Sequence, residues 1–131
     1  LVFFPVFFLL TAVHEFIHGL TWSRFCSGGF GSIAFGMIWK ALTPYCTCSE
    51  PLTKGQYILG GAMPTLVLGL ALSVSAVALA RPFLLVLAVT MVLAGGGDML
   101  IIAKLLCYRP KCRDTLYYDH PYECGLVAFE K

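Results

Sequence analysis

The stretch LVFFPVFFLLTAVHEFIHGL, residues 1–20, joins an uncharged apolar run to two histidines and a glutamate. His14 and His18 are four residues apart, so on a helix they lie on the same face, with Glu15 beside the first of them. This HExxH spacing is typical of a two-histidine metal site with a general base next to it. Ionisable groups inside a bilayer are costly and normally functional. We therefore interpret them as a metal site, rather than as side chains that only bond to neighbouring helices.

The composition around this motif indicates a membrane protein. Apolar residues make up 59% of the 131 residues and charged residues 12%, with a mean hydropathy of +0.84, whereas soluble domains carry about 25% charge. We expect an integral, multi-pass membrane protein with one membrane-embedded domain over residues 1–131. The net charge of +2 is too small to favour a nucleic-acid partner. Because the chain opens on Leu1 within an apolar run, we also expect further residues upstream.

Three segments are long enough to cross a hydrocarbon core as helices, which takes roughly 20 residues: about 1–23, 56–80 and 82–107. Arg81-Pro82 predicts a tight reversal between the last two. The connection over about 28–48 mixes β-branched and aromatic residues with glycine, which favours a small β-hairpin or edge strand. The tail, 108–131, is predicted to be irregular. The expected fold is thus mainly α, with three transmembrane helices and a small β element after the first.

Basic residues set the expected orientation. They concentrate in the first connection and after the third helix, whereas Arg81 marks the other side, so the positive-inside rule predicts a cytoplasmic connection and tail, with the site toward the cytoplasmic side. All six cysteines then lie where thiols stay reduced, and we expect them to be free. An alternative is a second metal site made by four of them. The basic residues are Arg24, Lys40, Lys54, Lys104, Arg109, Lys111 and Arg113; the cysteines are Cys26, Cys46, Cys48, Cys107, Cys112 and Cys124, of which Cys46, Cys48, Cys112 and Cys124 would form that site.

A catalytic zinc ion needs a third protein ligand, and depth in the membrane selects Asp98. At about 1.5 Å per residue, the two histidines lie roughly 12 Å from Arg24, and Asp98 lies about 9 Å from Lys104 along the third helix. The glycines at 95–97 would let that helix loosen locally or let another backbone approach. Asp119 and His120 are alternative ligands that would have to re-enter from the tail.

The motifs together resemble the small zincins of membranes related to the site-2 proteases. The resembling segments are HEFIHG at 14–19, TPYCTCSEP at 43–51, GGAMP at 60–64, GGGD at 95–98 and DHPYECG at 119–125, so the resemblance spans nearly the whole chain. It implies an intramembrane zinc peptidase with His14, His18 and Asp98 as ligands and Glu15 as base. The chain contains no asparagine, so the oxyanion-stabilising asparagine common in site-2 proteases is absent.

The expected function is hydrolysis of peptide bonds in membrane-associated substrates by a zinc-activated water, with Glu15 as general base. A substrate helix has its carbonyls paired, so we expect it to bind in extended form along an exposed strand in the region 33–45. The expected partners are a membrane protein or peptide substrate and the lipid bilayer. The alternative is a non-catalytic zinc-binding membrane protein, either a sensor or a degenerate peptidase, although a pure binding site would have no use for Glu15.

Overall fold

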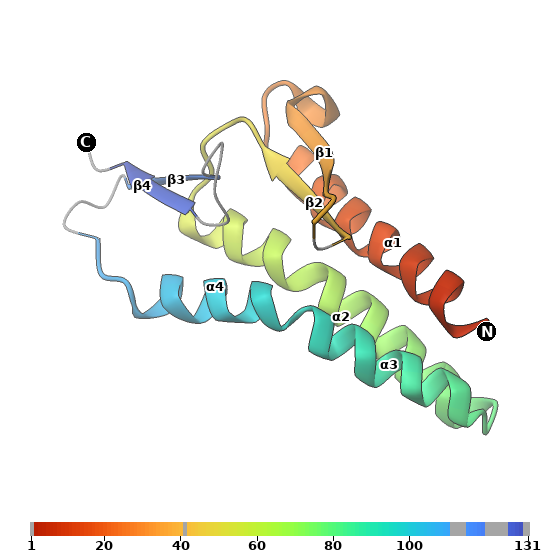
Figure 1. The fold of residues 1–131 in the computed structure, drawn as a ribbon. Helices are drawn as coiled ribbons and strands as arrows, with labels where there is room; N and C mark the ends of the chain where they lie inside the picture. The colour runs from red at the N-terminus through yellow and green to blue at the C-terminus, as the bar shows by residue number, and fades with distance from the viewer. Residues whose placement is uncertain (1, 41, 111–114, 120–125, 130–131) are drawn as a thin grey trace.

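The computed structural model describes residues 2–40, 42–110, 115–119 and 126–129. In these residues it is mainly helical, with two small antiparallel sheets (Figure 1). The elements in chain order are α1 (Phe3–Ser23), the 3₁₀ helix η1 (Gly29–Ser32), β1 (Ile33–Ile38), β2 (Thr43–Cys48), α2 (Lys54–Ala78), α3 (Pro82–Ala94), α4 (Gly96–Cys107), β3 (Leu116–Asp119) and β4 (Leu126–Phe129).

Helix α2 lies at the centre, with α1 on one side and α3 and α4 on the other (Figure 1). It begins at a capping box, in which the Thr53 side chain accepts from the Gln56 N–H and the Gln56 side chain accepts from the Thr53 N–H. Pro82 occupies the first turn of α3, where its missing N–H costs nothing. The predicted hairpin of helices around Arg81-Pro82 is confirmed. Three helical stretches, α1, α2 and Pro82–Cys107, are long and apolar enough to cross a membrane.

The third predicted helix, 82–107, is not continuous. It is divided at Gly95, whose ψ of 2° lies outside the helical range, so α3 ends at Ala94 and α4 starts at Gly96. Glycine makes this break inexpensive because it has the least preference for the helix of any residue but proline. A side chain at position 95 would collide with the Thr65 hydroxyl on α2. The absence of a side chain at Gly95 therefore lets α2 and the junction of α3 and α4 approach closely.

The predicted β-hairpin is present as β1 and β2, paired antiparallel with Ile33 opposite Cys48 and Ile38 opposite Thr43. It folds back along α1 (Figure 1), and its last paired residues line the same pocket as Thr11. Thr11 precedes Ser23 by 12 residues, which is about 18 Å along the helix axis. The hairpin therefore runs beside more than half of α1.

Two features accompany this placement of the hairpin. Gly19 of α1 leaves room for the Phe35 ring, because a Cβ there would lie 2.6 Å from it. Lys40 lies in the turn after β1. Its place beside the middle of α1 makes it a poorer marker of the membrane surface than the sequence suggested.

The prediction of an irregular tail is wrong for the described part of it. Residues 116–119 and 126–129 form the antiparallel pair β3 and β4, and Tyr117 also pairs through its backbone with Leu52. The tyrosine side chain is almost fully buried, which attaches this sheet to the start of α2. Cys112, His120 and Cys124 lie outside the described residues.

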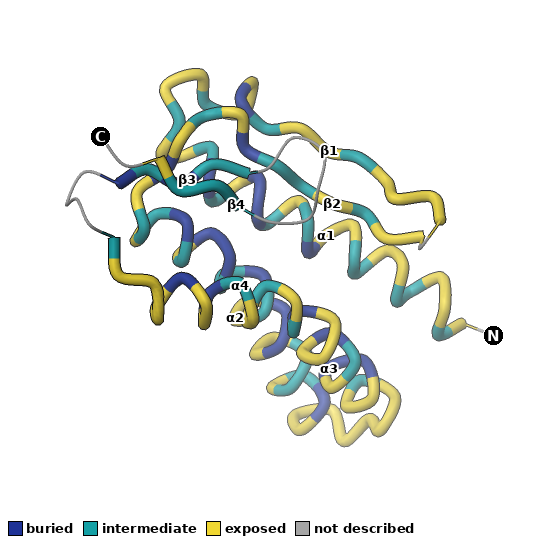
Figure 2. Tube along the Cα trace, turned by 60° about the vertical axis from the view of Figure 1, so that its left-hand side comes forward, coloured by how far each residue is buried: buried dark blue, intermediate teal, exposed yellow. Residues whose placement is uncertain are grey.

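One cluster of the hydrophobic core lies at the end of the molecule where α1 ends, α2 begins and β3 packs. Its members are Trp22, Cys48, Leu52, Tyr57, Leu105 and Tyr117. At the opposite end, exposed residues cover the first turns of α1 and the reversal between α2 and α3 (Figure 2). Large apolar side chains there face outward, including Val77 at 80% exposure and Leu79 at 62%. So much exposed apolar surface on long helices is typical of contact with lipid.

Candidate metal centre

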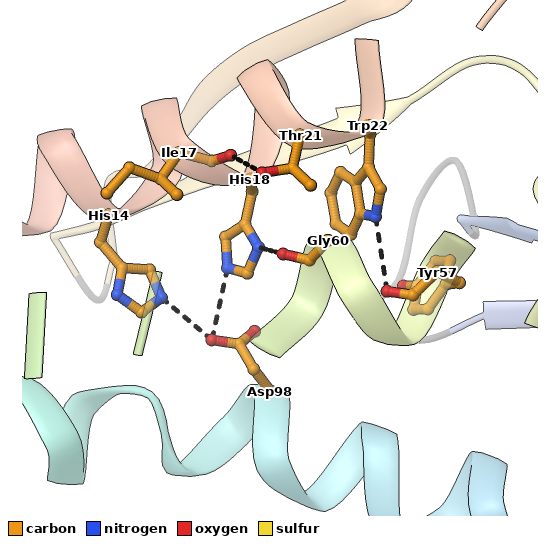
Figure 3. Close-up of polar contacts among 8 residues, drawn as sticks. All are labelled: His14, Ile17, His18, Thr21, Trp22, Tyr57, Gly60 and Asp98. Carbon is orange, nitrogen blue, oxygen red and sulfur yellow. Dashed lines mark hydrogen bonds and ion pairs between the residues drawn. The ribbon is translucent and has the colours of Figure 1, made fainter. Parts of the chain in front are cut away.

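The two histidines of α1 lie on one face, as their spacing predicts. Their ring centroids are 4.9 Å apart, and both side chains are buried, His14 at 6% exposure and His18 at 3%. Figure 3 shows both rings pointing from α1 toward the start of α4. The helix period alone produces this pair.

Asp98 reaches the histidines from the first turn of α4 (Figure 3). Its Oδ2 lies 3.0 Å from Nε2 of His14 and 3.4 Å from Nε2 of His18. The structure therefore brings together the three residues that the sequence placed at one depth. In the described part of the chain, His14, His18 and Asp98 are the group whose ligand atoms could hold a metal ion, all within 4.8 Å of one another.

This donor set fits zinc. Catalytic zinc sites use three protein ligands drawn from histidine, carboxylate and cysteine, at about 2.0–2.2 Å for nitrogen and oxygen. In a tetrahedron of that size, neighbouring ligand atoms lie roughly 3.3 Å apart, close to the 3.0 and 3.4 Å separations from Asp98 Oδ2.

The hydrogen bond on the far side of His18 strengthens this fit. Nδ1 of His18 lies 2.8 Å from the Gly60 carbonyl oxygen (Figure 3), and a carbonyl only accepts, so Nδ1 carries the hydrogen. In the neutral ring Nε2 then has a lone pair, which faces an oxygen of the Asp98 carboxylate. Two acceptors directed at each other call for a cation or a proton between them. Metal-bound histidines commonly donate their other N–H to a carbonyl in this way.

Glu15 lies beside this group without joining it. It lines a pocket of about 640 Å³ together with His14, His18 and Asp98. Its carboxylate is close to the backbone N–H of Cys46 on β2 and within electrostatic range of both histidines. A carboxylate next to the ligands, in a pocket able to hold substrate and water, is placed where a general base is needed.

Asp119, the alternative ligand, has a different set of partners. Its Oδ1 accepts from the Tyr57 hydroxyl at 2.6 Å, and its Oδ2 accepts from the Cys48 N–H at 2.9 Å. Burial raises the pKa of Asp119, although both hydrogen bonds favour its charged form. It lines the same pocket as the histidines, but both of its oxygens are already used to hold β3 against α2 and β2.

The cysteines described by the structure, Cys26, Cys46, Cys48 and Cys107, are free, as predicted. The Cys26 and Cys48 sulfurs lie 2.9 Å apart, and burial with this contact raises the pKa of Cys26 to about 12. Burial also raises the pKa of Cys46. The alternative four-cysteine metal site includes Cys112 and Cys124 and so lies outside the described residues.

Sequence reasoning missed the contacts that fix His18. The Trp22 ring stacks on the imidazole, with centroids 5.1 Å apart and planes at 16°, and Gly60 supplies the carbonyl. The i+4 spacing from His18 to Trp22 is a signal that could have found the stack. The hydrogen bond to Gly60 crosses between helices, and no local pattern indicates it.

Comparison with known proteins gives a match to one family. Residues 7–113 match the model of a family described as "putative zincin peptidase", a range that includes His14, Glu15, His18 and Asp98. No curated protein and no solved structure matches the chain significantly. Zincins are zinc peptidases built on HExxH, so the match points to a metallopeptidase with zinc as its cofactor. Since the match covers most of the 131 residues, the chain belongs to this zincin peptidase family.

Proposed function

We propose that the protein is an intramembrane zinc metalloprotease, related to the site-2 proteases, that cleaves membrane proteins or peptides. The observation that carries the proposal is the pair of facing acceptors, His18 Nε2 and Asp98 Oδ2, with His14 Nε2 completing the set. In this proposal His14, His18 and Asp98 hold the zinc ion. Bound there, zinc would polarise the scissile carbonyl and bring the pKa of a water molecule near 7.

Glu15 performs the proton transfers in the proposed mechanism. Its carboxylate takes a proton from the attacking water and passes it to the amine that leaves. Its position in the pocket wall, beside the histidines and the Cys46 N–H, supports this role. In this proposal the pocket walls, which come mainly from α1, β2, α3 and α4, hold the substrate backbone near Glu15 and limit the entry of bulk water.

The outer edge of β2 suits an extended substrate. Ser49 N–H donates to the Ser32 carbonyl, so by the alternation of an antiparallel pair Thr43, Tyr45 and Thr47 bond to β1. The backbones of residues 44, 46 and 48 then point away from β1. The 48 N–H is used by Asp119, and Pro44 has none. The Cys46 N–H faces the Glu15 carboxylate, so the outward carbonyl of Cys46 is the group of this edge to which a substrate strand adds.

The test uses purified protein in nanodiscs and a panel of transmembrane peptides. Glu15→Gln keeps the shape but removes the base, so zinc should stay near one per chain while cleavage falls by at least about a hundredfold. Mass spectrometry of the metal and of the peptide products measures both. Glu50→Gln, outside the pocket, is the matched control and should cleave normally.

Three outcomes of this test count against the proposal. Zinc loss in Glu15→Gln would make Glu15 a ligand, and unchanged cleavage would remove it as the base. Zinc binding by the parent protein without cleavage of any peptide would favour the non-catalytic alternative.

We further propose that the protein is multi-pass, with the site toward the cytoplasmic side. The end of α1, the start of α2 and the end of α4 lie together (Figure 1) and carry Arg24, Lys54 and Lys104, which favours a cytoplasmic position. Cys107 is free and exposed at this end. A membrane-impermeant maleimide should label it only after the cytoplasmic side is opened, whereas an Arg81→Cys variant should gain a label from outside. The reverse pattern would overturn the orientation.

A further inference from the structure

Helix α2 contains a proline in its interior and nevertheless continues from Lys54 to Ala78. Proline has no N–H, and its ring crowds the carbonyl four residues earlier. For Pro64 that carbonyl belongs to Gly60, which consequently lacks the helical donor that other interior carbonyls have. Both residues are buried, so solvent is a poor substitute. The Gly60 carbonyl thus needs a partner from outside its own helix.

His18 of α1 is that partner. Its Nδ1–H donates to the Gly60 oxygen at 2.8 Å. The approach is possible because Gly60 has no side chain, since a Cβ there would collide with the Trp22 indole that stacks on His18. The imidazole is therefore held from one side by the stack and from another by the carbonyl. Its remaining nitrogen, Nε2, is turned toward Asp98.

We propose that Pro64 is a positioning residue of the metal centre, because it leaves the Gly60 carbonyl free to hold His18 with Nδ1 protonated and Nε2 open for the metal. This inference rests on the proposed function of the same site. An ordinary residue at position 64 would bring an N–H that competes for the Gly60 oxygen. It would also let that carbonyl turn back toward the axis of α2, away from His18.

Pro64→Ala separates this role from ordinary helix packing. If Pro64 only affected packing, zinc affinity would change in the same direction as stability, whereas a positioning role predicts higher stability and lower zinc affinity. Alanine suits a helix interior better than proline, so the metal-free variant should melt at a higher temperature than the parent protein. Zinc affinity, measured by competition with a chelating dye in detergent, should nevertheless fall about tenfold. This is the lower end of the range for losing a group that hydrogen-bonds to a metal ligand. In ¹⁵N spectra of the metal-free variant, the fraction of His18 with its proton on Nε2 should rise.

Two further proteins complete the experiment. Lactic acid placed at position 64 by suppression also lacks an N–H, and it should restore most of the zinc affinity without the proline ring. Pro5→Ala, at an exposed position in the first turn of α1, is the matched control and should bind zinc as the parent does.

The inference would be overturned by parental zinc affinity and an unchanged His18 tautomer in Pro64→Ala. It would also be overturned by a loss of affinity that only follows a loss of stability. If the parent protein bound no zinc, the proposed function would fail. The tautomer of the metal-free protein would still decide whether Pro64 positions His18.

Discussion

Asp119 and Asp98 line the same pocket, and their surroundings differ. Asp119, on β3, has both oxygens occupied by the Tyr57 hydroxyl and the Cys48 N–H. Asp98, on α4, directs one oxygen at the Nε2 atoms of His14 and His18, and the second of these rings already has its hydrogen on Nδ1.

This difference distinguishes a structural carboxylate from a candidate ligand. A carboxylate that accepts a hydrogen bond at each oxygen fastens elements together, and turning it toward a metal would cost those bonds. A carboxylate opposed by the imidazole lone pair of His18 is stable only with a cation or proton between them. Proximity to the pocket does not separate the two residues, since both line it.

Removing each carboxylate in turn should give the largest contrast. Asp98→Ala deletes a proposed ligand, so zinc affinity should fall by more than roughly a hundredfold. That value is the upper end of the loss caused by removing a group that only hydrogen-bonds to a ligand. Asp119→Ala should keep zinc near the parental content. Metal content per chain, measured by mass spectrometry after gel filtration, checks both. Zinc retained in the first variant and lost in the second would make the tail the source of the ligand.

The reverse contrast should appear in stability. Asp119→Ala leaves the Tyr57 hydroxyl and the Cys48 N–H without their partner, so the free energy of unfolding should fall by about 2–3 kcal/mol. Denaturation of the metal-free protein in mixed micelles measures the change, with Tyr57→Phe as a partner variant that removes one of the two bonds. An unfolding free energy equal to that of the parent would show that β3 is not held through Asp119.

A smaller effect of the same kind is expected at Glu50, which like Asp119 accepts hydrogen bonds at both oxygens. It accepts from the N–H and hydroxyl of Ser27, the Gly28 N–H and the Ser32 hydroxyl. These bonds lower its pKa from 4.5 to about 2, so the stability they add is complete above about pH 4.5 and is lost as the pH falls toward 2.

The pH profile of Glu50→Gln checks this expectation. The difference in melting temperature between the parent and Glu50→Gln should shrink between pH 4.5 and 2. A difference that does not change with pH would show that these hydrogen bonds do not depend on the charge of Glu50.

The fold could be predicted where single segments carry a strong local signal. The long apolar runs indicated the helices, the mixed aromatic and β-branched stretch indicated the β1–β2 hairpin, and Arg81-Pro82 indicated the reversal. The glycines at 95–97 suggested a local loosening but not the division of the helix at Gly95. The β3–β4 pair was missed because four-residue strands are too short to show a period.

The candidate site could likewise be predicted only in part. That His14 and His18 share one face follows from the helix period, and the rise per residue placed Asp98 at their depth. Pro64 likewise implies a free carbonyl at Gly60 from the chain alone. The sequence does not indicate that His18 would take that carbonyl, or that Asp119 would be saturated by Tyr57 and Cys48.

The sequence by itself therefore determined the helices, the HExxH face and the depth of its third partner, since each depends on spacing along one segment or on a shared rise per residue. Only the tertiary structure decided which carboxylate remains available to a metal and which nitrogen of His18 faces it. Those outcomes depend on hydrogen bonds between elements 42 to 71 residues apart in the chain. Such bonds form only when α1, α2, β2 and β3 pack at particular distances, which no local pattern specifies.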